Sequence, residues 1–220
     1  MNPISQKKEA GIWVLAAVLL VASISLGLGV FVFNATHKIY LASDAVARNW
    51  LPSVQSIGKI RAALTQLRRE GGHIVIYGES CETRRCLEII EERKQALSAA
   101  ESAYAPLVTS GEEENLFDTY RRQRDLYLDI QQQLISRPEG ERSATLEEFI
   151  TRSDDAYDRV TTTLGRLAEF NSEGGRKAQV IVDHNYERTQ LGLYVLNFLL
   201  LGLAAAFTAK IISVAGHQRH

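Results

Sequence analysis

Two long stretches of this 220-residue chain carry no charged side chain, and they constrain its fold more than any other feature. Asp, Glu, Lys and Arg are absent from residues 10–37 and from residues 189–209. The apolar runs within them, 12–33 and 191–212, are long enough as helices to cross a hydrocarbon layer of about 30 Å. Lys210, near the end of the second run, can extend its ammonium group to the headgroups. We therefore expect two membrane-spanning helices.

A cleavable signal peptide is the alternative interpretation of the first run, because Lys7 and Lys8 form a basic segment in front of it. The apolar core of a signal peptide spans about 7–15 residues, and this run is longer. The pattern therefore favours a permanent membrane anchor.

The charges that flank the two runs predict the orientation of the chain. Two spans place both termini on the same side, and the short flanking segments carry Lys7, Lys8, Lys210 and Arg219. Positive flanks stay in the cytoplasm, so both termini should be cytoplasmic and the region between the spans should be exported to an oxidising compartment. The expected organisation is a short cytoplasmic N-terminus (1–11), a first span (12–33), a periplasmic domain (34–190), a second span (191–212) and a short cytoplasmic tail (213–220).

The region between the spans is polar, with a slight acidic excess. The chain has 25 Lys and Arg residues and 26 Asp and Glu residues, and only four of the basic residues and one of the acidic residues lie outside this region. The net charge is therefore about −4 between the spans and about +3 on the flanking segments. This balance excludes a basic nucleic-acid surface, and the recurring apolar residues are not typical of a disordered segment. The whole chain has only four prolines, which permits long helices.

Apolar and small residues recur in this region at alternating spacings of three and four, which predicts four helices with heptad-spaced core faces. Breaks fall at Gly78–Glu82 and Pro138–Gly140, and candidate capping boxes begin at Ser110 and Thr145. The two middle helices are of matching length, so the sequence predicts an all-α, antiparallel up-down-up-down four-helix bundle between two transmembrane helices. The expected core faces comprise Ile57, Ile60, Leu64, Leu67, Gly71 and Ile74; Ile90, Arg93, Leu97, Ala100, Tyr104 and Leu107; Phe117, Tyr120, Arg124, Tyr127, Gln131 and Leu134; and Tyr157, Val160, Leu164, Leu167, Asn171, Gly174, Ala178, Ile181 and Asn185.

The first and last helices run about 15 residues beyond the middle pair, and both lead directly into the spans. Counting back from the distal end of the bundle puts Pro52 and Asn171 at its membrane-proximal end. Proline there can kink the first helix. Asn171 is interpreted as a polar residue that fixes the helix register, and Gly174-Gly175 as a soft point in the last helix.

With these features the chain resembles the sensory half of bacterial methyl-accepting chemotaxis receptors. The resemblance rests on the basic N-terminus, the stretch Asn49–Val54 after the first span, the arginine-rich segment 61–69, and Glu169–Asn171 followed by an unbroken run into the second span. It implies an inner-membrane sensor that acts as a homodimer and binds a small periplasmic ligand. Histidine kinases and diguanylate cyclases use similar sensor modules, so the output is not specified.

The sequence departs from such receptors after its second span. Eight residues follow Ile212, where the family has a linker domain and a long cytoplasmic coiled coil. Three interpretations stay open: a fragment, a naturally truncated receptor, or a stand-alone membrane protein that uses the same module.

The first bundle helix carries a second stripe of residues beside its core face. Gly58, Ala62, Thr65 and Gly72 are small enough for another helix to approach closely, so we expect this face to form the homodimer contact. Three arginines lie on or near it, namely Arg68, Arg69 and, as a weaker candidate, Arg61. Guanidinium groups bind carboxylates in a bidentate manner, and the resemblance implies a small carboxylate ligand at this interface. The alternative is a solvated face with local acids as partners.

Cys81 and Cys86 are the only cysteines of the chain and lie at the expected distal turn. In an oxidising compartment this pair favours a disulfide that staples the turn, contributing about 2 kcal/mol or less through so small a ring. Metal binding or redox sensing with His73 is the alternative, although it would need a further ligand. We expect no metal and no cofactor.

No catalytic constellation is present in the sequence, which lacks nucleotide-binding glycine motifs and hydrolase triads. Tyr104, Tyr120, Tyr127 and Tyr157 favour core packing over a polar pocket. A transmembrane sensor of a small anionic ligand is therefore the leading hypothesis, with membrane lipids and full-length receptors as further contacts. The alternative is a membrane-anchored scaffold whose bundle binds a protein partner.

Overall fold

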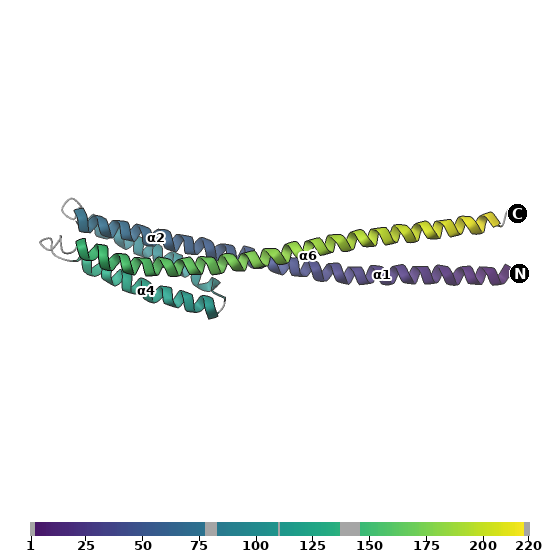
Figure 1. Ribbon diagram of the computed structural model, residues 1–220, viewed down its shortest axis with the longest axis horizontal. Coiled ribbons are helices and arrows are strands. Elements are labelled where there is room, and N and C mark those ends of the chain that lie inside the picture. The colour runs from purple at the N-terminus through teal and green to yellow at the C-terminus, as the bar shows by residue number, and fades with distance from the viewer. Residues whose placement is uncertain (1–2, 78–82, 110, 137–145, 218–220) are drawn as a thin grey trace. The chain divides into compact units, whose positions relative to one another are not determined.

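The computed structural model describes residues 3–77, 83–109, 111–136 and 146–217, which are helical almost throughout (Figure 1). The chain divides into two compact units. One unit is Asp44–Lys177, and the other combines Met1–Ser43 with Ala178–His220. Two long helices, α1 and α6, contribute to both.

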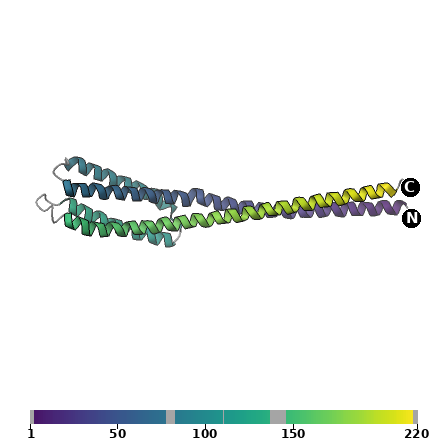
Figure 2. The ribbon, with the colours of Figure 1, turned by 45° about the horizontal axis from the view of Figure 1, so that its top comes forward.

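The unit Asp44–Lys177 is a four-helix bundle in which α2, α3, α4 and the first part of α6 lie side by side in alternating directions (Figures 1 and 2). The prediction of an all-α four-helix bundle is confirmed. We call the end where α2 meets α3 the tip, and the end where α3 meets α4 the base. In chain order the elements are η1 (Val46–Trp50), α2 (Leu51–Tyr77), α3 (Thr83–Tyr104), η2 (Ala105–Leu107), α4 (Gly111–Ile135), η4 (Phe149–Ser153) and α6 (Asp154–His217).

The bundle core follows the heptad faces expected from the sequence. Each helix buries its apolar stripe against the other three, and a fully buried side chain of this size contributes about 1.5–3 kcal/mol. The core includes Ile57, Ile60, Leu64, Leu67, Ile90, Leu97, Ala100, Tyr104, Phe117, Tyr120, Tyr127, Val160, Leu164 and Leu167. Along α6 the last buried residue of the expected stripe is Ala178, whereas the next residue of the stripe, Ile181, is exposed.

The base of the bundle lies where the sequence places it. Asn49 of η1 donates a hydrogen bond from Nδ2 to the carbonyl oxygen of Leu107 at 3.0 Å, which fixes the start of the first bundle helix against the α3–α4 connection. The helix path has a π turn just before Pro52. Proline has no N–H to donate to the carbonyl of Arg48 four residues earlier, and its ring crowds that carbonyl, which accounts for an irregular turn at this point.

In the second unit, α1 (Pro3–Ala45) and the last part of α6 lie alongside each other, and α1 begins at the same end of the pair as α6 ends (Figures 1 and 2). The helical stretches Val14–Val75 and Leu146–Lys210 each contain a segment long and apolar enough to cross a membrane. The expected spans, 12–33 and 191–212, lie within α1 and α6 respectively, and their boundaries stay predictions.

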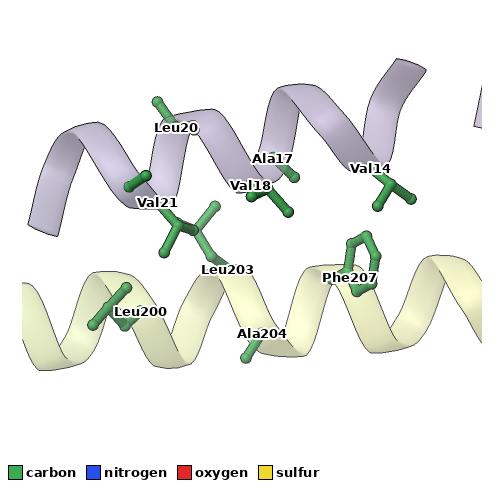
Figure 3. A pocket seen from close by; sticks show the side chains of 10 residues that line it. Val14, Ala17, Val18, Leu20, Val21, Leu200, Leu203, Ala204 and Phe207 are labelled. Carbon is green, nitrogen blue, oxygen red and sulfur yellow. The ribbon is translucent and has the colours of Figure 1, made fainter. Parts of the chain in front are cut away.

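The surface of this helix pair is strongly apolar. Phe33 is 71% exposed and Phe198 is 75% exposed, which is unfavourable in water and suited to lipid. Between the helices lies a pocket of about 540 Å³ that aliphatic and aromatic side chains line, including Val14, Val18 and Phe207 (Figure 3).

Candidate functional site

A buried carboxylate organises the base of the bundle. Glu113, in the first turn of α4, is fully buried and accepts at least four hydrogen bonds from the described residues. Tyr104 Oη and Asn171 Nδ2 donate to its Oε1 at 2.7 and 2.8 Å, while the backbone N–H and Oγ1 of Thr109 donate to its Oε2 at 2.9 and 3.1 Å. We call these four residues the Glu113 cluster. So many donors satisfy a carboxylate that burial alone would destabilise.

The Glu113 cluster joins α6 to two other helices. Asn171 of α6 directs its Nδ2 to Glu113, to Tyr104 Oη at 3.2 Å and to the carbonyl of Leu167 at 3.0 Å. Burial and the adjacent carboxylate raise the pKa of Tyr104, so its hydroxyl stays a donor. The cluster therefore fixes the height of α6 against α3 and α4, which agrees with the role in helix register expected for Asn171.

Trp50, the last residue of η1, packs against the glycine pair of α6. A Cβ atom placed on Gly174 would lie 2.6 Å from Trp50 Cζ3, whereas on Gly175 it would lie 3.5 Å from Trp50 Cβ. Carbon atoms pack at about 3.5–4.0 Å, so only Gly174 is required by the ring. The sequence suggested a soft point here; the structure adds a steric reason for the first glycine.

A second buried acid, Glu101 of α3, lies between two residues of α4. It accepts hydrogen bonds from Tyr120 Oη and from Arg124 Nη1, the latter at 2.6 Å. Burial raises the pKa of Glu101 above its usual value, and the bonds from Tyr120 and Arg124 only partly oppose this. Glu101 therefore links α3 to α4, although burial disfavours its charged form more than Tyr120 and Arg124 favour it.

In the tip half of the bundle, Arg68 of α2 contacts α6. Its Nη2 lies 2.6 Å from Asp154 Oδ1, and its guanidinium carbon lies 4.5 Å from the centre of the Tyr157 ring. The Tyr157 hydroxyl shares a hydrogen bond of 2.9 Å with Thr65 Oγ1. About a third of each charged side chain is exposed, so a small anion can reach Arg68.

The other expected ligand-binding arginines lie at the surface. The Arg69 side chain is 72% exposed and pairs with the adjacent Glu70 at 2.9 Å, as the local-acid interpretation expects. Arg61 is also exposed, and its Nη2 lies over Gly165 of α6. Arg68 therefore pairs with α6, whereas Arg69 and Arg61 lie at the surface, and ligand binding by these arginines stays a prediction.

The residues expected at a homodimer contact divide into two groups. Gly58, Ala62 and Thr65 are exposed on α2, and the space around Gly58 is open. Gly72 is buried within the protomer. Three of the four are accessible to another helix, and the dimer contact stays a prediction.

The expected disulfide falls where the structure gives no side-chain description. Cys81 and the side chain of Cys86 lie outside the described residues, as do Ser110 and Thr145 of the two capping boxes. Within the described part of the chain, no group of three His, Cys, Asp or Glu side chains is arranged to hold a metal ion.

The sequence favoured core packing for all four tyrosines. The structure buries Tyr104, Tyr120 and Tyr127 and leaves Tyr157 half-buried at the edge of the core. The sequence did not predict the buried acids Glu101 and Glu113. Glu113 was assigned only to a capping box with Ser110. Tyrosine on a core face whose hydroxyl needs an acceptor is the signal that would have pointed to both acids.

These features define a class of protein: a four-helix bundle whose last helix continues as an apolar segment able to cross a membrane. The chain belongs to the family described as a four helix bundle sensory module for signal transduction, found in chemotaxis receptors, whose model matches residues 12–186. No curated protein matches the chain.

Proposed function

We propose that this chain is a two-pass inner-membrane sensor whose bundle lies in the periplasm, with both termini in the cytoplasm. It detects a small anionic ligand and passes the signal through α6. The observation that carries this proposal is that α6 is one helix, Asp154–His217, which contacts Arg68 near its start and the Glu113 cluster further along before it enters the apolar segment. A change in either contact acts on the helix that leads into the membrane.

The contact of Arg68 with Asp154 gives a route from ligand to helix. A carboxylate ligand held by Arg68 and Arg69 competes with Asp154 for the guanidinium group of Arg68, because both carboxylates accept hydrogen bonds from it. Binding would release the first turn of α6 from α2. In a homodimer packed through the exposed stripe of Gly58, Ala62 and Thr65, arginines from both protomers would meet at such a ligand.

Ligand binding is tested with the full chain in lipid nanodiscs. A thermal-shift screen against organic acids should find an acid that raises the melting temperature, and Arg69→Ala or Arg68→Ala should abolish that shift. Arg122→Ala, on the exposed face of α4, is the matched control and should leave it intact. If organic acids shift the melting temperatures of Arg68→Ala and Arg69→Ala as they shift that of the wild type, the bundle is not a carboxylate sensor at this face.

Topology is tested separately, in a background where Cys81 and Cys86 are replaced by serine. Ser98 is exposed on α3, so a membrane-impermeant maleimide should label Ser98→Cys in intact spheroplasts. Ser5→Cys should be labelled only after permeabilisation. The reverse pattern would contradict the proposed orientation.

A further inference from the structure

A second pocket lies at the base of the bundle, on the outside of α4. It has a volume of about 340 Å³, at the small end of the range for ligand sites. The α3–α4 connection and the first three turns of α4 line it, with Val108, Thr109, Glu114, Phe117, Asp118 and Arg121 among the lining residues. We call it the α4 pocket.

The α4 pocket presents charges of both signs beside an aromatic wall. Glu114, Asp118 and Arg121 share one face of α4 at spacings of four and three residues. The guanidinium carbon of Arg121 lies 4.3 Å from the centre of the Phe117 ring, which orients the cation. Arg121 Nη1 and Asp118 Oδ1 are 3.8 Å apart, too far for a hydrogen bond, and both side chains are about half exposed. Both charges are therefore available to a ligand.

We propose that the α4 pocket binds a small zwitterion with an apolar side chain, a molecule of the size and type of leucine. An anion alone would meet the carboxylates of Glu114 and Asp118, and a cation alone would meet Arg121. A zwitterion places its carboxylate on the guanidinium fork and its ammonium group by the two acids. Its side chain then covers the half-buried Val108.

An occupant of the α4 pocket touches two residues that bear on α6. Thr109 donates two hydrogen bonds to Glu113 Oε2, while Glu113 Oε1 accepts one from Asn171. Phe117 contacts the ring of Tyr104 edge-on at 4.9 Å. Occupancy is thus connected to α6 through the Glu113 cluster.

This inference does not rest on the proposed anion site. Asn49 marks the base, because it binds Leu107, and Arg69 lies twenty residues further along the helical chain, about 30 Å away. Either site can be present without the other. Their tests use different arginines, and the α4 pocket is tested in an Arg68→Ala/Arg69→Ala background, so that carboxylates bound at the proposed anion site do not contribute.

The ligand class is tested by isothermal titration of the full chain, in this background, in nanodiscs with three matched probes. Leucine carries both charges, isoamylamine is the same molecule without the carboxylate, and 4-methylpentanoate is the same molecule without the amine. Leucine should bind at least about tenfold more tightly than either half-molecule. Absent leucine binding, or equal binding of a half-molecule, overturns the proposal.

Matched variants locate the binding. Arg121→Gln should weaken leucine binding at least about tenfold, and Glu114→Gln should weaken it in the same direction. Arg122→Gln is the control, since Arg122 is the next residue of α4 and bonds Thr119 on its own helix. If neither Arg121→Gln nor Glu114→Gln changes the leucine affinity, the ligand binds elsewhere and the proposal is overturned.

Discussion

The two ends of the bundle use charge in opposite ways. At the base, Glu113 is fully buried and accepts hydrogen bonds from Tyr104, Thr109 and Asn171, so that it links three helices. In the tip half, Arg68 and Arg69 are partly or mostly exposed, and their ion pairs are open to water. Buried hydrogen-bonded charges fix a geometry, whereas exposed ion pairs exchange partners at small cost. The difference teaches that the base fixes the position of α6, while the charges of the tip half are free to exchange partners.

Removing the carboxylate at the base should have the largest effect. Glu113→Ala leaves the donors of Tyr104, Thr109 and Asn171 without their acceptor, at about 1–3 kcal/mol for each buried group that finds no other partner. We expect the free energy of unfolding to fall by about 3–5 kcal/mol, measured by urea denaturation followed by circular dichroism. Glu114→Ala, one residue along and exposed, is the control. If Glu113→Ala lowers the free energy of unfolding by less than about 1 kcal/mol, the two ends of the bundle do not differ in the way described.

The glycine pair of α6 sharpens the same comparison at a second point of the base. Gly174→Ala should destabilise the bundle by about 1–3 kcal/mol, because the new methyl group meets the Trp50 ring. Gly175→Ala should be neutral or stabilising by up to about 1 kcal/mol, since alanine favours the helix. Combining Gly174→Ala with Trp50→Leu should recover part of the loss in the same denaturation assay. Equal effects of the two single substitutions would argue against the steric explanation.

The pH dependence of the folding stability should show that Glu101 behaves as a buried carboxyl group and not as an exposed one. Burial raises its pKa in the folded state, so the folded protein keeps the proton at pH values where the unfolded chain has lost it. The resulting stability is complete below the ordinary value of 4.5 and is lost as the pH rises through the raised pKa. Relative to Glu101→Gln, the wild type should therefore lose stability as the pH rises from about 4 towards 7. If the unfolding free energies of the wild type and Glu101→Gln change in parallel with pH, this expectation is wrong.

The smallest effects are expected in the tip half. Arg68→Ala removes a partly exposed ion pair and a cation–π contact, so the unfolding free energy should fall by about 1 kcal/mol or less. Arg69→Ala should change it by less than about 0.5 kcal/mol, because its only partner described here is the adjacent Glu70 at the surface. Added salt should reduce the Arg68 effect in the same assay. A loss comparable to that of Glu113→Ala would mean that both ends are fixed.

The fold was predictable from the sequence because heptad spacing determines which face of each helix is buried. Leu64, Leu97 and Leu164 lie in the core as their spacing requires. The base was also predictable, since helix length alone placed Pro52 and Asn171 there. Apolar periodicity is a property of single helices, and it carries over to the bundle without knowledge of the neighbours.

The polar network was not predictable in the same way. Glu101 and Glu113 look like surface acids in a periodic pattern, and only the opposing helices reveal that Tyr120 and Asn171 bind them. The requirement for Gly174 likewise depends on Trp50, more than a hundred residues earlier in the chain. Pairings between distant residues need the relative rotation and height of two helices, which one sequence does not supply.

The contact of Trp50 with the glycine pair also makes the base visible by fluorescence. The chain has two tryptophans, and the other, Trp13, belongs to the first apolar run. A Trp13→Phe variant would leave a single indole at the joint between η1 and α6. Its emission wavelength and its quenching by a soluble reagent would then follow this joint in the intact protein, without an attached dye.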